Sequence, residues 1–206
     1  MYVYAALGGV VGISAEGENR GQILWETNFF NHSVVAPAPV ILPDNRIYLT
    51  AGYGAGSIVI KIVKENDSYK AELSQKLTPK EGFASEQQTP ILYQNHLFGI
   101  LPKDAGGLKT QFVCCSAEDC SKILWSSGKT HRFGLGPFII ADNKFFILSD
   151  DGELTIAKVS SKKYQQLASA KILDGVDAWG PLAIVNGRLF ARDSKQMVCV
   201  DLRKGK

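Results

Sequence analysis

"PFIIADNKFFILSDDGELTIAKV", residues 137–159, contains three apolar segments that are separated by two short polar turns. The apolar segments are rich in Phe, Ile and Leu, while the turns contain Asp, Asn and Gly. Aromatic and β-branched residues favour strands, and Asn, Asp and Gly accept the positive φ that a tight hairpin requires. The stretch therefore predicts three consecutive antiparallel strands that are joined by short turns.

The same pattern occurs three more times in the chain, at residues 39–62, 90–117 and 181–202. Each copy begins with a proline and has an aromatic residue eight or nine positions later. The prolines, Pro39, Pro90, Pro137 and Pro181, are 44 to 51 residues apart. The aromatic residues are Tyr48, Phe98, Phe146 and Phe190. A repeat of this period indicates one structural unit that recurs along the whole chain.

A fourth strand is expected in most units, at residues 70–77, 123–127 and 164–173. Units of 40 to 50 residues with four antiparallel strands are typical of β-propeller blades. The sequence thus predicts an all-β protein, a β-propeller of four-stranded antiparallel blades.

The two ends of the chain give partial units. Residues 1–28 match the second, third and fourth strands, and residues 181–203 match the first three. We expect a single propeller domain over residues 1–206, with three full and two partial blades at approximately 2–28, 37–78, 88–128, 135–173 and 179–203. One interpretation is a compact five-bladed protein with ragged terminal blades. We favour the other, in which the domain is incomplete at its N-terminus and belongs to a larger ring.

The segments "GQILW" at residues 21–25 and "SKILW" at residues 121–125 complete two of these units. Together with the proline-led strands, they resemble the repeats of the PQQ-like (quinoprotein alcohol dehydrogenase-like) β-propeller superfamily, and the resemblance extends from Tyr2 to Arg203. It implies the C-terminal part of an eight-bladed ring. It also implies a periplasmic or otherwise exported protein whose signal peptide lies upstream of this chain.

Charge and hydropathy exclude two classes of partner. The formal net charge is only +3, and the one short basic block is residues 203–206, so we expect no nucleic-acid partner. The longest apolar stretches are far shorter than the roughly 20 residues that span a bilayer. We therefore expect the chain not to be transmembrane.

The segment "FVCCSAEDCSKILW", residues 112–125, raises the question of a redox or metal site. Adjacent strand residues point to opposite faces, and neighbouring Cα atoms lie about 3.8 Å apart, closer than a disulfide prefers. We interpret Cys114 and Cys115 as ordinary buried strand residues. Two alternatives remain, a hairpin disulfide between Cys115 and Cys120 and a contact with a cofactor. Cys199 occupies the same type of strand, which favours packing.

Candidate binding residues lie where one blade leads into the next, on the loop face of the propeller. We expect Gln88, His131 and Trp179, each within six residues of a blade-opening proline, to meet at the mouth of the central channel. The alternative for Trp179 is that it plugs the channel as a packing residue. Other candidates on this face are His32, Asp104, Asp151 and Arg192.

The adjacent Asp150 and Asp151 could belong to the carboxylate-rich calcium site of a PQQ enzyme. However, "DDGE" at residues 150–153 is also typical of a type I′ hairpin turn, which we favour.

The sequence contains no G-x-S-x-G or H-E-x-x-H motif and no convincing cluster of metal ligands. We therefore expect a non-catalytic binding or scaffold module, similar in kind to the propeller of the outer-membrane barrel-assembly machinery. It would bind a protein partner or a small-molecule ligand at the loop face, without catalytic residues, metal or cofactor. The alternative is a PQQ-dependent dehydrogenase that oxidises an alcohol or a sugar with PQQ and calcium.

Overall fold

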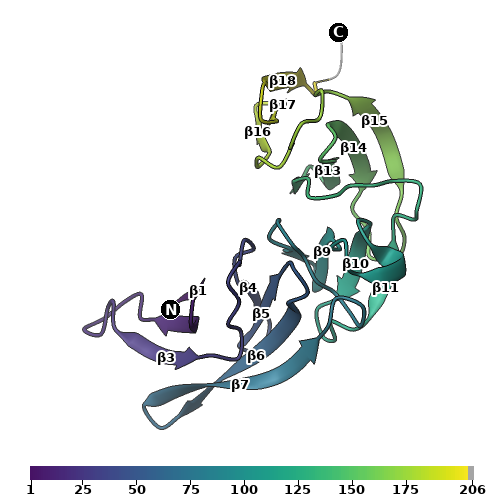
Figure 1. Ribbon diagram of the computed structural model, residues 1–206. Coiled ribbons are helices and arrows are strands. Elements are labelled where there is room, and N and C mark those ends of the chain that lie inside the picture. Colours follow the sequence, from purple (N-terminus) through teal and green to yellow (C-terminus); the bar gives the residue numbers. More distant parts are fainter. Residues whose placement is uncertain (204–206) are drawn as a thin grey trace.

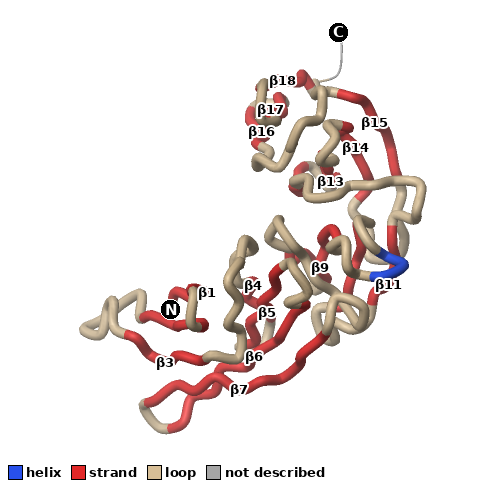
Figure 2. The backbone as a smooth tube through the Cα atoms, viewed as in Figure 1, coloured by secondary structure: helices blue, strands red, loops and turns tan. Residues whose placement is uncertain are grey.

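The computed structural model describes residues 1–203, and it confirms the all-β prediction. It contains five antiparallel sheets and, within those residues, one helical turn, the 3-10 helix η1 (Gly106–Leu108). The sheets, which we call blades 1 to 5, follow one another along a curved arc from the N-terminus to the C-terminus (Figure 1). Most loops within a blade are shorter than the loops that connect the blades, but the loop at residues 101–111 of blade 3 is as long as some connecting loops (Figure 2).

Blades 2, 3 and 4 have four strands each, and blades 1 and 5 have three, always paired in sequence order. Blade 1 contains β1 (Tyr2–Ala6), β2 (Gly9–Ile13) and β3 (Ile23–Thr27). Blade 2 contains β4 (Val40–Leu42), β5 (Arg46–Ala51), β6 (Gly56–Glu65) and β7 (Ser68–Leu77). Blade 3 contains β8 (Ile91–Tyr93), β9 (His96–Ile100), β10 (Phe112–Ser116) and β11 (Ile123–Ser126). Blade 4 contains β12 (Phe138–Ala141), β13 (Lys144–Leu148), β14 (Glu153–Lys158) and β15 (Gln166–Lys171). Blade 5 contains β16 (Ala183–Val185), β17 (Arg188–Arg192) and β18 (Met197–Asp201).

The turns between the first and second strands use the residues that the sequence predicted. In blade 4 the two central residues, Asp142 and Asn143, have φ values of 46° and 55°. In blade 2, Asp44 and Asn45 have φ values of 60° and 57°. Positive φ at both central positions defines the type I′ turn, whose twist matches that of the flanking strands.

The turn at Asp150 and Asp151 corrects the sequence prediction. In this loop only Gly152 has a positive φ, of 89°, and its N–H donates to the carbonyl of Ser149 at 2.9 Å. The Ser149 hydroxyl also accepts the N–H of Glu153 at 2.9 Å. This is the pattern of a type I turn followed by a glycine bulge, and not of type I′, because the loop has three residues instead of two.

The core lies between the blades, where the face of one sheet packs against the face of the next. Alternate residues of one strand serve different interfaces, so that Ile47 and Leu49 pack against blade 1 while Tyr48 packs against blade 3. Between blades 3 and 4 the fully buried ring of Phe112 lies 5.3 Å from Phe138 and 5.0 Å from Phe145, measured between centroids. Edge-to-face geometry at such distances is favourable for aromatic pairs.

Over residues 1–203, no blade covers the two outer faces of the arc. On blade 1, the side chains of Tyr2 and Tyr4 are 70% and 63% exposed. On blade 5, Met197 is 71% exposed and Cys199 is also exposed. Over the described residues Cys199 therefore does not pack against a neighbouring blade, because no blade lies against this side of β18.

We expect Phe112→Ala to lower the free energy of unfolding by about 3 to 5 kcal/mol, because it opens a cavity among four aromatic rings. Leu167→Ala, at a 49% exposed position on the outer strand β15, should cost less than about 0.5 kcal/mol. Urea unfolding followed by circular dichroism would measure both. Equal effects of the two substitutions would contradict a core that lies between the blades.

Candidate functional site

The loop face contains the connecting segments that run from the outer strand of one blade to the inner strand of the next. It also contains the turns between the second and third strands. The segment that precedes blade 3 is fixed by three buried hydroxyl groups of blade 2. Tyr48 and Ser57 donate to the carbonyl of Phe83 at 2.8 and 2.7 Å, and the Thr50 hydroxyl accepts the N–H of Ser85 at 2.9 Å. Burial raises the pKa of Tyr48 well above its ordinary value, which keeps its hydroxyl group a donor.

Gln88 joins three connecting segments. Its Nε2 donates to the carbonyl of Leu135 at 3.2 Å and to the carbonyl of Trp179 at 3.1 Å, so it links the segments that lead into blades 3, 4 and 5. Its own carbonyl accepts the hydroxyl of Ser85 at 2.7 Å. The structure therefore brings Gln88 and Trp179 together. The Trp179 side chain is 40% exposed, which does not agree with a buried plug.

Arg192 and Asp150 each contact one of the segments that Gln88 links. The guanidinium group of Arg192 lies over Gly180, next to Trp179 in the chain, where even a Cβ atom would come within 2.7 Å of it. Asp150 forms a bidentate ion pair with Arg132 and accepts the N–H of Leu135 at 3.2 Å. Because its two oxygens are engaged in this way, Asp150 holds a connecting segment in place.

His131 lies apart from Gln88 and Trp179. Its ring stacks on Phe133, with 6.2 Å between centroids and 24° between planes, and also approaches Tyr164 of the loop before β15. His131 does not join Gln88 and Trp179 because of the path of its connecting segment, which crosses from the outer to the inner side of the arc. Six residues before Pro137 the chain has not yet reached the inner side.

Around His131 the structure shows a basic hollow that the sequence did not predict, because two separate segments form it. The hollow has a volume of about 320 Å³. Basic side chains from two segments line it. They are Lys109, Lys129, His131 and Arg132, and the other lining residues are Gly106, Gly107, Thr110 and Gln111. The run "GKTHR" at residues 128–132 was visible in the sequence. The opposing wall was not, since it comes from the long loop after β9.

The other candidates on this face are dispersed. The His32 ring packs edge-on against Phe30, 4.6 Å away between centroids. Asp151 accepts the hydroxyl of Ser149, and Asp104 has one buried carboxylate oxygen without a hydrogen-bond partner. Over residues 1–203, no three His, Cys, Asp or Glu side chains are grouped so that they could hold a metal ion. The same residues include no helix long and apolar enough to cross a membrane.

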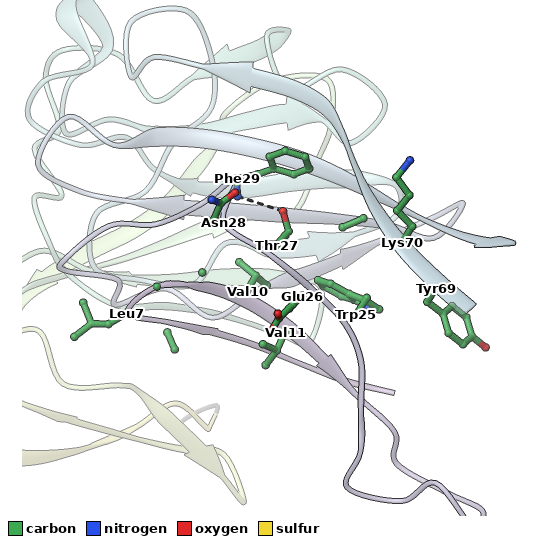
Figure 3. A pocket seen from close by; sticks show the side chains of 14 residues that line it. Leu7, Val10, Val11, Trp25, Glu26, Thr27, Asn28, Phe29, Tyr69 and Lys70 are labelled. Carbon is green, nitrogen blue, oxygen red and sulfur yellow. Dashed lines mark hydrogen bonds between the residues drawn. The ribbon is translucent and has the colours of Figure 1, made fainter. Parts of the chain in front are cut away.

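A second hollow, of about 760 Å³, lies beside blade 1 (Figure 3). Its walls are the turn between β1 and β2, the strand β3 with the residues that follow it, and the beginning of β7. Trp25, Glu26, Phe29, Tyr69 and Lys70 are among the side chains that line it. The sequence did not predict this hollow, because it depends on the ten-residue length of β6 and β7.

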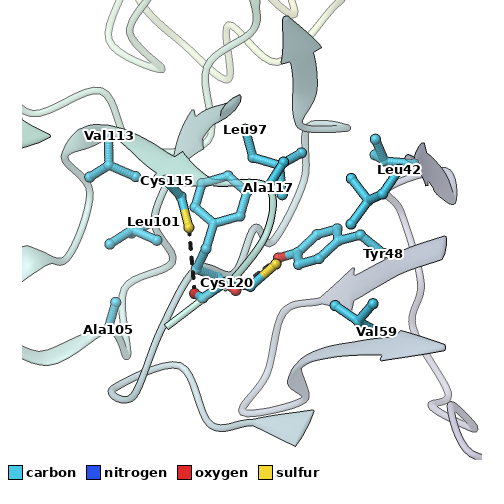
Figure 4. Close-up of a cluster of buried hydrophobic side chains, with 12 residues drawn as sticks. Leu42, Tyr48, Val59, Leu97, Leu101, Ala105, Val113, Cys115, Ala117 and Cys120 are labelled. Carbon is cyan, nitrogen blue, oxygen red and sulfur yellow. Dashed lines mark hydrogen bonds between the residues drawn. The ribbon is translucent and has the colours of Figure 1, made fainter. Parts of the chain in front are cut away.

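The cysteines of blade 3 are free thiols in packed positions, as the sequence predicted. Cys114 faces blade 4 and Cys115 faces blade 2, and both are fully buried. Cys115 and Cys120 belong to the same apolar cluster, where the Cys115 thiol donates to the carbonyl of Cys120 at 3.5 Å (Figure 4). Burial raises the pKa of Cys114 to about 12, so its thiolate is scarce at neutral pH.

Comparison with known proteins places the fold. No family model matches the chain, and neither does any curated protein sequence. Among solved structures, BamB from Moraxella catarrhalis superposes with a TM-score of 0.63 at 12% identity, over 98% of this chain and 57% of that one. The computationally designed Ika4 protein superposes with a TM-score of 0.55 at 13% identity, over 89% of this chain and 99% of that one. The fold is that of a β-propeller repeat protein, and the chain spans 57% of the length of BamB.

We expect iodoacetamide at pH 8 to label Cys199 alone in the folded protein, because the other three thiols are buried. In denaturant all four should react. The number of adducts would be read from the intact mass, and their positions from peptide mapping. Rapid labelling of Cys114 or Cys115 in the folded protein would contradict the packing that the structure shows.

Proposed function

We propose that this chain is a non-catalytic binding or scaffold module that holds a partner polypeptide on its loop face. The observation that carries the proposal is the double hydrogen bond of Gln88 to the carbonyls of Leu135 and Trp179. It fixes three connecting segments relative to one another and leaves a 40% exposed indole on a rigid support. Exposed tryptophans on rigid surfaces are among the residues that contribute most to protein interfaces.

The shape of the loop face favours a polypeptide over a small molecule. The cavity beside Gln88 has a volume of only about 10 Å³, which is room for about one water molecule. A ligand therefore has no enclosed pocket beneath Gln88, and it must lie across the face. Small-molecule sites are usually deeper, with volumes of about 300 to 1,000 Å³.

The basic hollow around His131 suggests the charge of the partner. Lys109 and Lys129 line it, together with Arg132, whose charge is balanced by Asp150, and no Asp or Glu is among its lining residues. We infer that an acidic segment of the partner lies in this hollow while an apolar part contacts Trp179. Complementary charges at the edge of an interface act mainly on specificity and on the rate of association.

We also propose that the repeats belong to the PQQ-like class. Trp25 and Trp125 support this assignment because they occupy the same position in blades 1 and 3. Each pairs with the residue just before a register shift, Gly12 in one blade and Cys114 in the other. Membership of an eight-bladed ring and export from the cytoplasm are parts of this proposal.

The proposal predicts where a partner can be cross-linked. A photoreactive amino acid at position 179 should capture a partner in an extract of the cells that produce the protein. The same group at position 124, on the outer strand β11, should not, although Leu124 is similarly exposed at 46%. Unlabelled protein should compete with the capture, and its Trp179→Ala variant should compete at least tenfold less well. Cross-linked products would be compared on gels and identified by mass spectrometry.

Two results would contradict the proposal. One is equal capture at positions 179 and 124, which would indicate contact without a defined face. The other is calcium-dependent dye reduction by the protein after reconstitution with PQQ, which would favour a dehydrogenase that oxidises an alcohol or a sugar.

A further inference from the structure

The long loop of blade 3, residues 101–111, separates two hollows. It carries η1 to the outer rim of the arc, where Figure 2 shows this turn in blue. The basic hollow around His131 lies against one side of η1, and a hollow of about 260 Å³ beside Leu108 lies against another. We call it the Leu108 hollow. Blade 3 is the middle one of five and packs against both of its neighbours. Blades 2, 3 and 4 therefore build both hollows, away from the two ends of the described chain.

The geometry of η1 assigns its residues to the two hollows. In a 3-10 helix, residues three positions apart lie on the same side. Ala105 and Leu108 have this spacing, and both line the Leu108 hollow. Gly106 and Lys109 have it too, and they line the basic hollow together with Gly107. A single turn of main chain is thus the wall between the hollows.

The Leu108 hollow has an apolar floor that belongs to the core between blades 2 and 3. The floor consists of Leu101, Ala105, Leu108 and Ile123. On the rim, the carboxylate of Glu81 accepts the N–H and the hydroxyl of Thr78 at 2.9 and 2.8 Å, so its charge is engaged. The volume is below the about 300 to 1,000 Å³ of most small-molecule sites. The hollow therefore suits one apolar side chain better than a whole ligand.

The basic hollow contains positive charge that no neighbouring group balances. Arg132 is paired with Asp150. Lys109 and Lys129 form no ion pair over residues 1–203. A carboxylate that enters the hollow would be attracted by both ammonium groups. The charge therefore favours an acidic side chain as the occupant.

The wall between the hollows is bare main chain, because it carries two glycines. Gly106 has a φ of 61°, which favours glycine there for conformational reasons. Gly107 has no positive φ, and a Cβ atom at this position would meet nothing within 4 Å. The turn itself therefore does not require a glycine at position 107. What its absence of a side chain provides is room for another main chain to approach closely.

We propose that an extended segment of the partner polypeptide crosses η1 and places an acidic side chain in the basic hollow and a large apolar side chain in the Leu108 hollow. The inference rests on the proposed function, which places an acidic segment in the basic hollow, and it adds a second anchor and the spacing between the two. Alternate side chains of an extended segment point the same way and lie about 6.6 Å apart. A wall one turn wide therefore fits an acidic and an apolar residue two positions apart.

A phage-displayed library of random peptides, selected on the full chain, tests the inference without a known partner. We expect the enriched peptides to share an Asp or Glu two positions from a Leu, Ile, Met or Phe. One of them, labelled with a fluorophore, would then be measured by fluorescence anisotropy. Changing its acid to the corresponding amide, or its apolar residue to serine, should weaken binding at least tenfold.

Variants of the protein locate the peptide. Gly107→Leu places a bulky side chain on the wall and should weaken binding more than tenfold. Gly107→Ala is its matched control and should change binding less than twofold. Lys129→Glu reverses a charge of the basic hollow and should also weaken binding more than tenfold. Lys195→Glu, at an exposed position in blade 5, changes the net charge equally and should have no effect.

Several results would overturn the inference. They are the lack of a common motif among the selected peptides, a motif without the acidic or the apolar residue, and equal binding to the Gly107→Leu variant. So would a dimer, detected by light scattering, that Lys129→Glu dissociates, because a second copy would then occupy the hollows. If Gly107→Leu does not fold, as judged by circular dichroism, the altered peptides still decide the question.

The cross-linking experiment at position 179 separates this inference from the proposed function. Unlabelled Gly107→Leu protein that competes with the capture as well as the unchanged protein would overturn this inference alone. Equal capture at positions 179 and 124 would overturn the proposed function.

Discussion

The fold of this protein depends on burying both faces of its central blades. A sheet in which alternate residues of each strand are apolar on both sides must bury both sides, and in blades 2, 3 and 4 the neighbouring blades do so. Ile47 and Tyr48 show the principle, because adjacent residues of β5 serve two different interfaces. The hydrophobic effect therefore acts along the arc, and each blade stabilises the next.

The arrangement of the loop face also follows from the close packing of the blades. Because blades 2 and 3 pack closely, the segment between them passes through their interface, where Tyr48, Thr50 and Ser57 fix its main chain. That path brings Gln88 to the position from which its amide reaches two further segments. The exposure of Trp179 on a rigid support is thus a consequence of how the blades pack.

Features that depend on short-range sequence were predictable. The Asp and Asn residues at positions 44, 45, 142 and 143 indicated tight turns with positive φ, and the alternation of a strand indicated that Cys114 and Cys115 diverge. Features that depend on the path of a long loop were not predictable. The distance of His131 from Gln88 and Trp179 follows from the course of the segment before blade 4. The amide of Gln88 bonds to a carbonyl 91 residues away, which no local pattern indicates.

Hydrogen exchange of the folded protein tests most directly whether the blades stabilise one another across their faces. The account predicts that amides of β9, β10 and β13, which lie in blades covered on both sides, exchange only when the whole molecule unfolds. Amides of β1 and β18, in the two blades with an uncovered face, should exchange much faster. Equal protection of β1, β18 and β13 would contradict the account, because it would mean that a single interface stabilises a blade as well as two.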